Sequence, residues 1–222
     1  ILCVTFTNKA AREMQNRISS FLNEKVSSLP WLGTFHSVSA KILRRHAEAV
    51  GLNSRFTIID QEDQLRLIKN ICKAENIDVK KISQQFILSF INQWKNKGLL
   101  PKDVIVKRGV PLEKAILNVY KFYQERLKIL NSCDFGDLIL LCVTMFENNS
   151  DILELYLNNF KYILVDEYQD SNYIQSKWLK LLAKKNNNIC CVGDDDQSIY
   201  SWRGAEIRNF LDFSKTYKNT KI

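Results

Sequence analysis

The sequence predicts an α/β protein in which a parallel β-sheet carries an all-helical insertion. Short apolar runs alternate with stretches of helical periodicity in the first and last parts of the chain, which is the pattern of a parallel sheet. One run, residues 162–165, lacks polar alternation, as expected of a central strand buried on both faces. Between about residues 55 and 131 only helical patterns occur, and this block is the predicted insertion.

The first 54 residues fit two strand–helix units. A β run at residues 2–6 is followed by Thr7 or Asn8, either of which can cap a helix that reaches Leu22. A second run, about residues 31–35, leads through His36 into another helix, which Gly51 closes. The chain starts without methionine and within a strand, so we expect it to be a fragment.

The insertion and the last part of the chain are assigned from apolar spacing, capping residues and proline. The helices expected in the insertion cover about residues 61–74, 82–95 and 111–130. The later segments expected are an apolar helix that starts at residues 134–138, helices at about 152–160, 173–183 and 205–213, a strand at 188–192, and the start of one more strand at 220–222.

Charge is distributed unevenly along the chain. The net charge of +8 divides into +4 for residues 1–54, +7 for residues 55–131 and −3 for residues 132–222. This distribution would suit a protein with a nucleotide–metal centre on its acidic part and a polyanion-binding surface on its basic part. Solvated lysine-rich helix faces would give it as well.

Six cysteines, at positions 3, 72, 133, 142, 190 and 191, form no CxxC pair, and only two histidines accompany them, which argues against a zinc site. Most lie in apolar runs, so we interpret them as buried thiols of a reducing, cytoplasmic compartment. No apolar run approaches the roughly 18 to 20 residues that span a bilayer, and no secretory apolar segment is visible. We therefore expect no membrane partner.

The apolar run at residues 162–165 ends abruptly in Asp166, Glu167 and Asp170. Ligands of open α/β sheets bind beyond the carboxyl ends of the strands. Adjacent residues diverge there, so one carboxylate can hold a hydrated Mg²⁺ while the next polarises a water, as nucleotide hydrolysis requires. The alternative is that both acids only open the following helix and complement its dipole.

All four predicted strands stop in polar or aromatic residues, and a parallel sheet brings these ends to one edge. After the first two strands, the candidates for contacts with nucleic acid are Phe6, Asn8, Thr34 and His36. Phe6 could instead be a packing residue, and His36, at the start of a helix, could merely pack against that helix or cap it.

The segment after the fourth strand combines two kinds of chemistry. Gln197 follows three aspartates and offers a neutral amide to a terminal phosphate. Tyr200, Trp202 and Arg203 are flat groups that can stack on unpaired bases. Trp202 could instead belong to the core.

Four segments resemble, in order and spacing, motifs Ia, Ib, II and III of the UvrD/PcrA/Rep helicases: residues 5–14, 33–37, 165–170 and 192–205. The resemblance covers essentially the whole chain, and the last segment is the most specific. Residues 134–138 also resemble the point where that family returns from its helical insertion, called 1B, to its first RecA-like domain, called 1A. The resemblance implies a RecA-like sheet of the P-loop NTPase type, with 1A at residues 1–54 and 132–222 and 1B at residues 55–131.

The resemblance also implies a role for each candidate residue. Asp166 would coordinate Mg²⁺, Glu167 would activate the attacking water, and Gln197 would sense the terminal phosphate of ATP. The residues implied in DNA binding are Phe6, Tyr200 and Trp202 in base pockets, with Arg203, His36, Thr34 and Asn8 on the strand nearby.

Members of this family hydrolyse ATP to move 3′ to 5′ on single-stranded DNA and unwind duplex, commonly in repair or replication. The resemblance therefore implies single-stranded and duplex DNA as partners, together with repair or replication proteins. The basic insertion would contact the duplex or a strand.

The sequence departs from the family pattern in what it lacks. No GxxxxGK[ST] phosphate loop occurs, and neither the later arginine motif nor the second RecA-like domain is present. We therefore expect this segment alone to lack ATPase activity. Two alternatives stay open: a non-catalytic nucleic-acid-binding remnant, and the motor portion of a helicase–nuclease.

Overall fold

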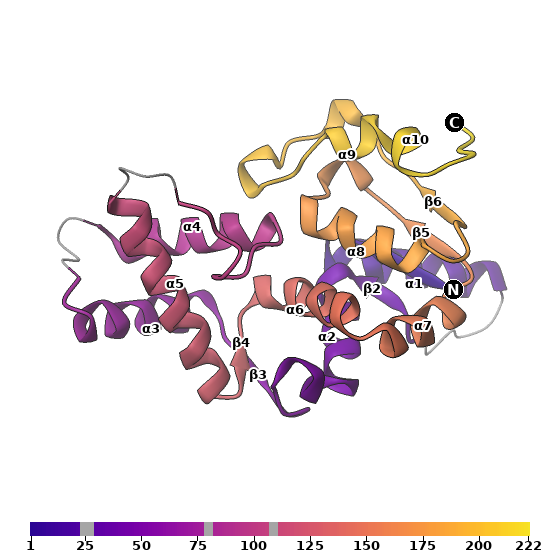
Figure 1. Cartoon of the computed structure of the whole chain (residues 1–222). Helices are drawn as coiled ribbons and strands as arrows, with labels where there is room; N and C mark the ends of the chain where they lie inside the picture. The colour runs from indigo at the N-terminus through magenta and orange to yellow at the C-terminus, as the bar shows by residue number, and fades with distance from the viewer. Residues whose placement is uncertain (23–28, 78–81, 107–110) are drawn as a thin grey trace. The chain divides into compact units, whose positions relative to one another are not determined.

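The computed structural model describes residues 1–22, 29–77, 82–106 and 111–222, without the side chain of Arg203. The chain divides into two compact units, residues 1–42 with 142–222 (the sheet unit) and residues 43–141 (the helical unit). The division falls within helices α2 (Phe35–Arg45) and α6 (Phe135–Asn148) (Figure 1). None of the helices in the described ranges is long and apolar enough to cross a membrane.

The sheet unit contains a four-stranded parallel sheet, which confirms the predicted fold class. The strands are β1 (Leu2–Thr5), β2 (Leu32–Thr34), β5 (Ile163–Val165) and β6 (Ile189–Cys191), in the order β2-β1-β5-β6. Val4 is level with Gly33 on one side and Val165 on the other, and Val165 is level with Cys191. The carboxyl ends of all four strands therefore meet at one edge of the sheet.

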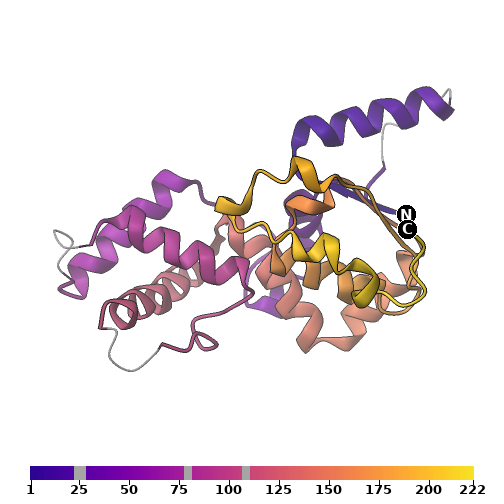
Figure 2. The same cartoon turned by 90° about the horizontal axis from the view of Figure 1, so that it is seen from above.

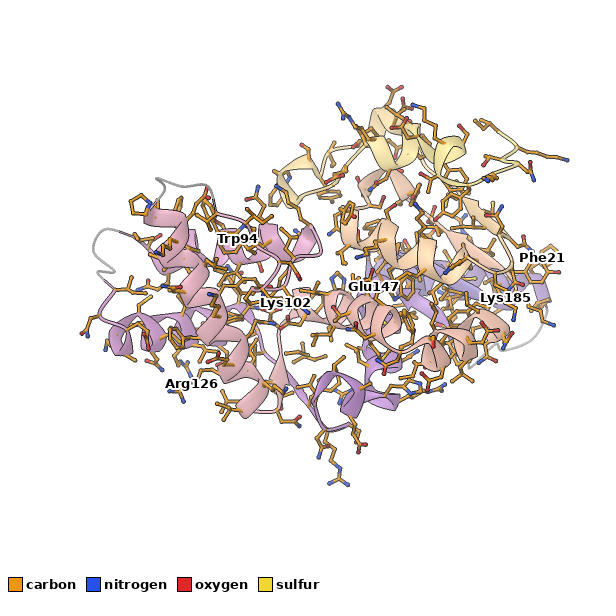
Figure 3. All side chains as sticks on the ribbon, in the orientation of Figure 1. Phe21, Trp94, Lys102, Arg126, Glu147 and Lys185 are labelled. Carbon is orange, nitrogen blue, oxygen red and sulfur yellow. The ribbon has the colours of Figure 1, made fainter. Side chains whose placement is uncertain are left out.

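Helices of the sheet unit begin at capping residues that the sequence supplies. The helices that lie wholly within this unit are α1 (Asn8–Leu22), α7 (Ser150–Asn159), α8 (Tyr173–Ala183), α9 (Arg208–Leu211) and α10 (Phe213–Thr216). The Thr7 hydroxyl accepts a hydrogen bond from the Ala10 N–H at 3.1 Å, so Thr7 is the cap of α1. α1 extends along the outside of the unit (Figure 2), and Phe21 near its end is 88% exposed (Figure 3).

The segment after the fourth strand differs from its prediction. The single helix expected at residues 205–213 is two short helices that meet at Asp212. The reason is a competing bond: the Glu206 N–H donates to the Ser171 carbonyl at 2.9 Å, so the backbone is tied to the loop after β5. Residues 220–222 form no strand with any residue of the described ranges.

The central strand is buried on one face, and the prediction of burial on both faces is wrong. Ile163 and Val165 are buried, but Leu164 between them is 42% exposed. Cys190, its neighbour on β6, is exposed too, so the prediction of a buried thiol is wrong there. Because side chains alternate along a strand, Leu164 and Cys190 share one face, which stays accessible in the described chain.

In the described ranges, three helices and a small sheet lie wholly within the helical unit. The elements are α3 (Gln61–Ala74), α4 (Gln84–Asn96) and α5 (Pro111–Ile129), with β3 (Thr57–Ile58) paired in parallel to β4 (Ser132–Cys133) and a 3₁₀ turn, η1 (Ala47–Val50). The helices agree closely with prediction, and Gly51, with φ of 73°, closes η1 rather than α2. The expectation of helices alone is wrong for residues 57–58, because a two-residue strand is too short to show a period.

Apolar stripes of α3, α4 and α5 meet in a core that includes Ile68, Ile91 and Tyr120. Trp94 of α4 stacks on Tyr120 of α5 with ring centroids 5.7 Å apart and an interplanar angle of 26° (Figure 3). The three helices pack pairwise on one another (Figure 1).

A buried ionic cluster fixes one end of this core. Lys95 is 1% exposed, and its Nζ lies 2.6 Å from Asp134 Oδ2 and 2.7 Å from Asp137 Oδ1. The Tyr123 hydroxyl donates to Asp134 Oδ2 at 2.8 Å, and Lys95 also donates to Gln124 Oε1 at 3.0 Å. Burial disfavours the ammonium, but the two carboxylates outweigh it and raise the pKa of Lys95. Burial and the neighbouring Asp134 raise the pKa of Asp137 to about 6.

Replacing Lys95 by methionine removes the cation and leaves two buried carboxylates side by side. We expect Lys95→Met to lower the free energy of unfolding by about 3–5 kcal/mol, as when one partner of a buried pair is removed. Urea denaturation at pH 7.5 measures the change. Lys97→Met, at an exposed position of the same helix end, is the control and should cost about 0.5 kcal/mol or less. Equal losses for the two variants would contradict the role of the cluster.

Candidate functional site

Hydrogen bonds extend beyond the strands at the carboxyl edge of the sheet. The Asp166 N–H donates to the Val4 carbonyl at 3.0 Å, and the Val192 N–H donates to the Val165 carbonyl at 2.8 Å. The Tyr168 N–H then donates to the Val192 carbonyl at 3.0 Å. The segments that follow β5 and β6 are thereby fixed to the sheet and to each other.

Asp166 and Glu167 leave β5 at this edge. Both are half-buried. Glu167 has φ of 56° and ψ of 38°, the left-handed region; the other non-glycine residues with positive φ in the described ranges are all asparagines. A glutamate there is uncommon and costs free energy, and such residues cluster at functional sites.

The acids do not open the following α-helix. α8 is capped by Asn172, whose side chain accepts from the Gln175 N–H at 3.0 Å while Gln175 Oε1 accepts from the Asn172 N–H at 2.9 Å. Glu167 precedes only a 3₁₀ turn, η2 (Tyr168–Asp170), and makes no side-chain cap bond to it. The helix-opening interpretation of Asp166 and Glu167 is therefore wrong. A half-buried carboxylate such as that of Asp166 fits Mg²⁺, which takes one or two carboxylates and otherwise binds water and phosphate.

A residue that the sequence did not single out connects this segment to the next. Gln169 is 0% exposed, and its Nε2 donates to Glu167 Oε2 at 2.6 Å. Its Oε1 accepts from the Asp194 N–H at 3.2 Å. Only its position inside the acidic segment could have drawn attention to it. Burial, and then the Glu167 carboxylate, raise the pKa of the neighbouring Asp170.

The segment after β6 holds Gln197 in place. The Asp194 carboxylate accepts from the Asp196 N–H at 3.1 Å and from Gln197 Nε2 at 2.6 Å. Asp194 thereby caps a short 3₁₀ turn, η3 (Asp195–Gln197), whose backbone bond from the Gln197 N–H to the Asp194 carbonyl is 3.2 Å long. Asp194 thus orients the amide of Gln197 on an exposed segment, at the same edge of the sheet as Asp166 and Glu167.

Aromatic side chains at the edge fall into two groups. Phe6 is half-buried and packs on Phe35 with ring centroids 5.1 Å apart, and Phe35 packs on buried Trp178 at 5.8 Å. Tyr200 and Trp202 lie 6.5 Å apart around the turn η4 (Ser201–Arg203), and Trp202 is 74% exposed. The interpretation of Trp202 as a core residue is therefore wrong, whereas Phe6 both packs and remains partly accessible.

The polar candidates differ in what their side chains already do. The Thr34 hydroxyl is buried and accepts from the Ser37 N–H at 3.1 Å, so it caps α2. Asn8 is exposed at the start of α1. His36 is half-buried, and the desolvation of its ring lowers its pKa to about 4, so His36 is a neutral ring near pH 7. The side chain of Arg203 lies outside the described part of the chain.

The burial of His36 can be tested by titration. We expect its imidazole to titrate near pH 4, because burial disfavours the charged form. Two-dimensional NMR of the imidazole resonances measures the midpoint, and His36→Asn assigns the signal, since the chain has two histidines. Because the pKa is lower in the folded state, stability should decrease as the pH falls from about 6.5 towards 4. A midpoint near 6.5 would contradict the desolvation of the ring.

A family model and individual relatives among known proteins agree on the family that this chain resembles. A family model described as UvrD/REP helicase N-terminal domain matches residues 1–218. The chain is similar to a probable DNA helicase II homolog of Rickettsia conorii, at 49% identity over 225 residues that cover 100% of this chain and 34% of the relative. It is also similar to the ATP-dependent DNA helicase PcrA of Staphylococcus epidermidis, at 44% identity over 100% of this chain and 30% of the relative. The chain thus spans about a third of the length of these relatives.

Proposed function

Since the chain belongs to the UvrD/REP helicase N-terminal domain family, we propose that it forms the N-terminal motor portion of an ATP-dependent DNA helicase. The observation that carries the proposal is the sheet edge at which Asp166, Glu167 and the segment holding Gln197 come together. The relatives named as DNA helicases support it. Movement 3′ to 5′ on single-stranded DNA and duplex unwinding in repair or replication are part of the proposal, as are repair or replication proteins as further partners.

In this function Asp166 holds Mg²⁺ and Glu167 orients and polarises the attacking water. When bound, Mg²⁺ neutralises charge on the phosphates of ATP. Glu167 leaves β5 at a fixed angle because its backbone lies in the left-handed region and its carboxylate accepts from Gln169. Gln197 meets the terminal phosphate through an uncharged amide, oriented by Asp194. The 222 residues contain no GxxxxGK[ST], and we propose that residues 1–222 alone do not turn over ATP.

In the same proposal the aromatic residues bind unpaired bases. Trp202 offers an exposed ring for stacking and Tyr200 a half-buried one. Phe6 packs on Phe35, which packs on Trp178, so its accessible face is held in place. Neutral His36 contributes a ring or a hydrogen bond rather than a charge. The remaining proposed DNA contacts are Asn8, Thr34 and Arg203. The basic segment at residues 55–131, which we propose as the 1B insertion, adds a polyanion-binding surface.

The role of Glu167 is tested in the full product of the gene that encodes this chain. Glu167→Gln should lower the turnover of ATP by about 10² to 10⁴, because the amide cannot accept the proton of the attacking water. Nucleotide affinity should stay within about twofold, since the side-chain volume is unchanged. Steady-state ATPase rates and titration with a fluorescent nucleotide measure the two quantities.

Glu147→Gln is the control for this experiment, since Glu147, near the end of α6, pairs with Lys177 of α8 at 2.8 Å (Figure 3). It should leave turnover unchanged. If Glu167→Gln kept wild-type turnover, the catalytic assignment would be wrong. If the wild-type protein bound no nucleotide, the helicase proposal itself would fail.

Stacking by Trp202 is tested by single-strand binding. Trp202→Ala should weaken binding of an oligonucleotide by about 1–3 kcal/mol with little dependence on base sequence, because every base has a face to stack. Trp202→Phe should retain most of the affinity. Fluorescence anisotropy with thymine-only and mixed strands makes the measurement. Tyr162→Ala, an exposed aromatic at the opposite end of β5, is the control; an equal loss there would show a non-specific effect.

A further inference from the structure

Gln169 connects two segments of the chain through hydrogen bonds: the residues that follow β5 and the residues that follow β6. It is a fully buried glutamine whose amide is used on both sides: its Nε2 donates to the Glu167 carboxylate at 2.6 Å and its Oε1 accepts from the Asp194 N–H at 3.2 Å. Among neutral side chains only an amide offers two N–H donors together with a carbonyl acceptor. Because a buried group without a partner is costly, both bonds are held in the folded protein.

The chain is shaped closely around this amide. A Cβ on Gly193 would lie 2.4 Å from Gln169 Oε1 and 2.9 Å from Phe210 Cε2. Glycine at position 193 is therefore required for space, since the chain leaving β6 passes directly over the amide. The ring of Phe210 in α9 also lies against this glycine, so a side chain at position 193 would have to displace either the amide or the ring.

The bridge continues to the predicted phosphate-sensing residue. The residue whose N–H binds Gln169, Asp194, accepts from Gln197 Nε2 at 2.6 Å through its own carboxylate. Glu167, Gln169, Asp194 and Gln197 thus form one chain of hydrogen bonds across the ends of β5 and β6. A shift of Gln197 would be passed through Asp194 and Gln169 to the Glu167 carboxylate.

We propose that Gln169 is a positioning residue that couples the water-activating carboxylate of Glu167 to the Asp194–Gln197 segment. The proposal rests on the helicase function proposed above and deepens it. Gln169 acts through Glu167 and Asp194, and its removal should therefore affect the chemical step more than the binding of nucleotide or DNA.

The first test replaces the amide by a side chain of similar length without polar groups. In the full gene product, Gln169→Met should lower the kcat of DNA-stimulated ATP hydrolysis by about 10- to 100-fold, the effect of misplacing a catalytic group by about 1 Å. The KM for MgATP and the affinity for single-stranded DNA should stay within about twofold. Gln175→Met is the matched control: Gln175 is a buried glutamine of the same unit that caps α8, and its loss should reduce stability but not kcat.

Two further variants separate positioning from a merely structural role. Gln169→Glu keeps the acceptor for the Asp194 N–H but places a second carboxylate beside Glu167, so that one of the two has a raised pKa. Once protonated, Glu at this position can donate to Glu167 again, and its kcat relative to wild type should therefore rise as the pH is lowered from about 8.5 to 6. Gly193→Ala should reproduce the defect of Gln169→Met by displacing the amide, and the double variant should be no worse than either single one.

The outcomes are distinct. The coupling would be overturned if Gln169→Met and Gly193→Ala both kept the wild-type kcat. If Glu167→Gln were inactive in the same experiment, the helicase proposal would still stand. An additive double variant would also overturn it, because the two residues would then act independently. If Gln169→Met does not fold, the pH profile of Gln169→Glu decides, and a flat ratio to wild type counts against the coupling. Absence of turnover in the wild-type protein would instead refute the proposed function on which the coupling rests.

Discussion

Alignment of the parallel strands is the constraint on which the candidate site depends. Val4, Val165 and Cys191 stand level across three strands, and the hydrogen bonds of Asp166 and Val192 continue the ladder beyond the strands. A shift of β5 by one residue would reverse the direction of every side chain that follows it. The positions of the carboxylates are therefore set by the buried side of the sheet, where Ile163 and Val165 pack, rather than by the acids themselves.

On this rigid edge the polar groups are positioned by departures from regular structure. Glu167 takes a left-handed conformation and the following residues form a 3₁₀ turn in place of an α-helix. The chain after β6 passes over Gln169 only because residue 193 is glycine. Each departure carries a cost that the packed sheet beneath can sustain. The irregular backbone at the strand ends thus gives the sheet edge a specific arrangement of hydrogen-bond donors and acceptors.

Sequence patterns predicted the regular parts of this molecule and missed the parts that depend on long-range contacts. The parallel sheet, α3 and α8 follow from periodicity and caps, and the residues at the strand ends could be selected because parallel strands end together. The exposed face at Leu164 and Cys190 could not be foreseen, since an apolar run does not show which of its faces is covered. Gln169 was missed for a related reason: its partners lie two and 25 residues away, and only the fold brings the second one near.

The described part of the chain contains two buried polar networks. In both, the buried polar groups have hydrogen-bond partners, and the networks differ in the groups at which they end. Lys95 pairs with Asp134 and Asp137 inside the helical unit, and its network, which also includes the half-buried Gln124, serves to hold that core together. The network of Gln169 begins in the core but ends at Glu167, which is half-buried, and at an exposed segment. A buried amide whose bonds all led to other buried groups would only stabilise the fold. Because this one leads from the core to groups that solvent and ligands can reach, it can transmit the rigidity of the sheet to the site.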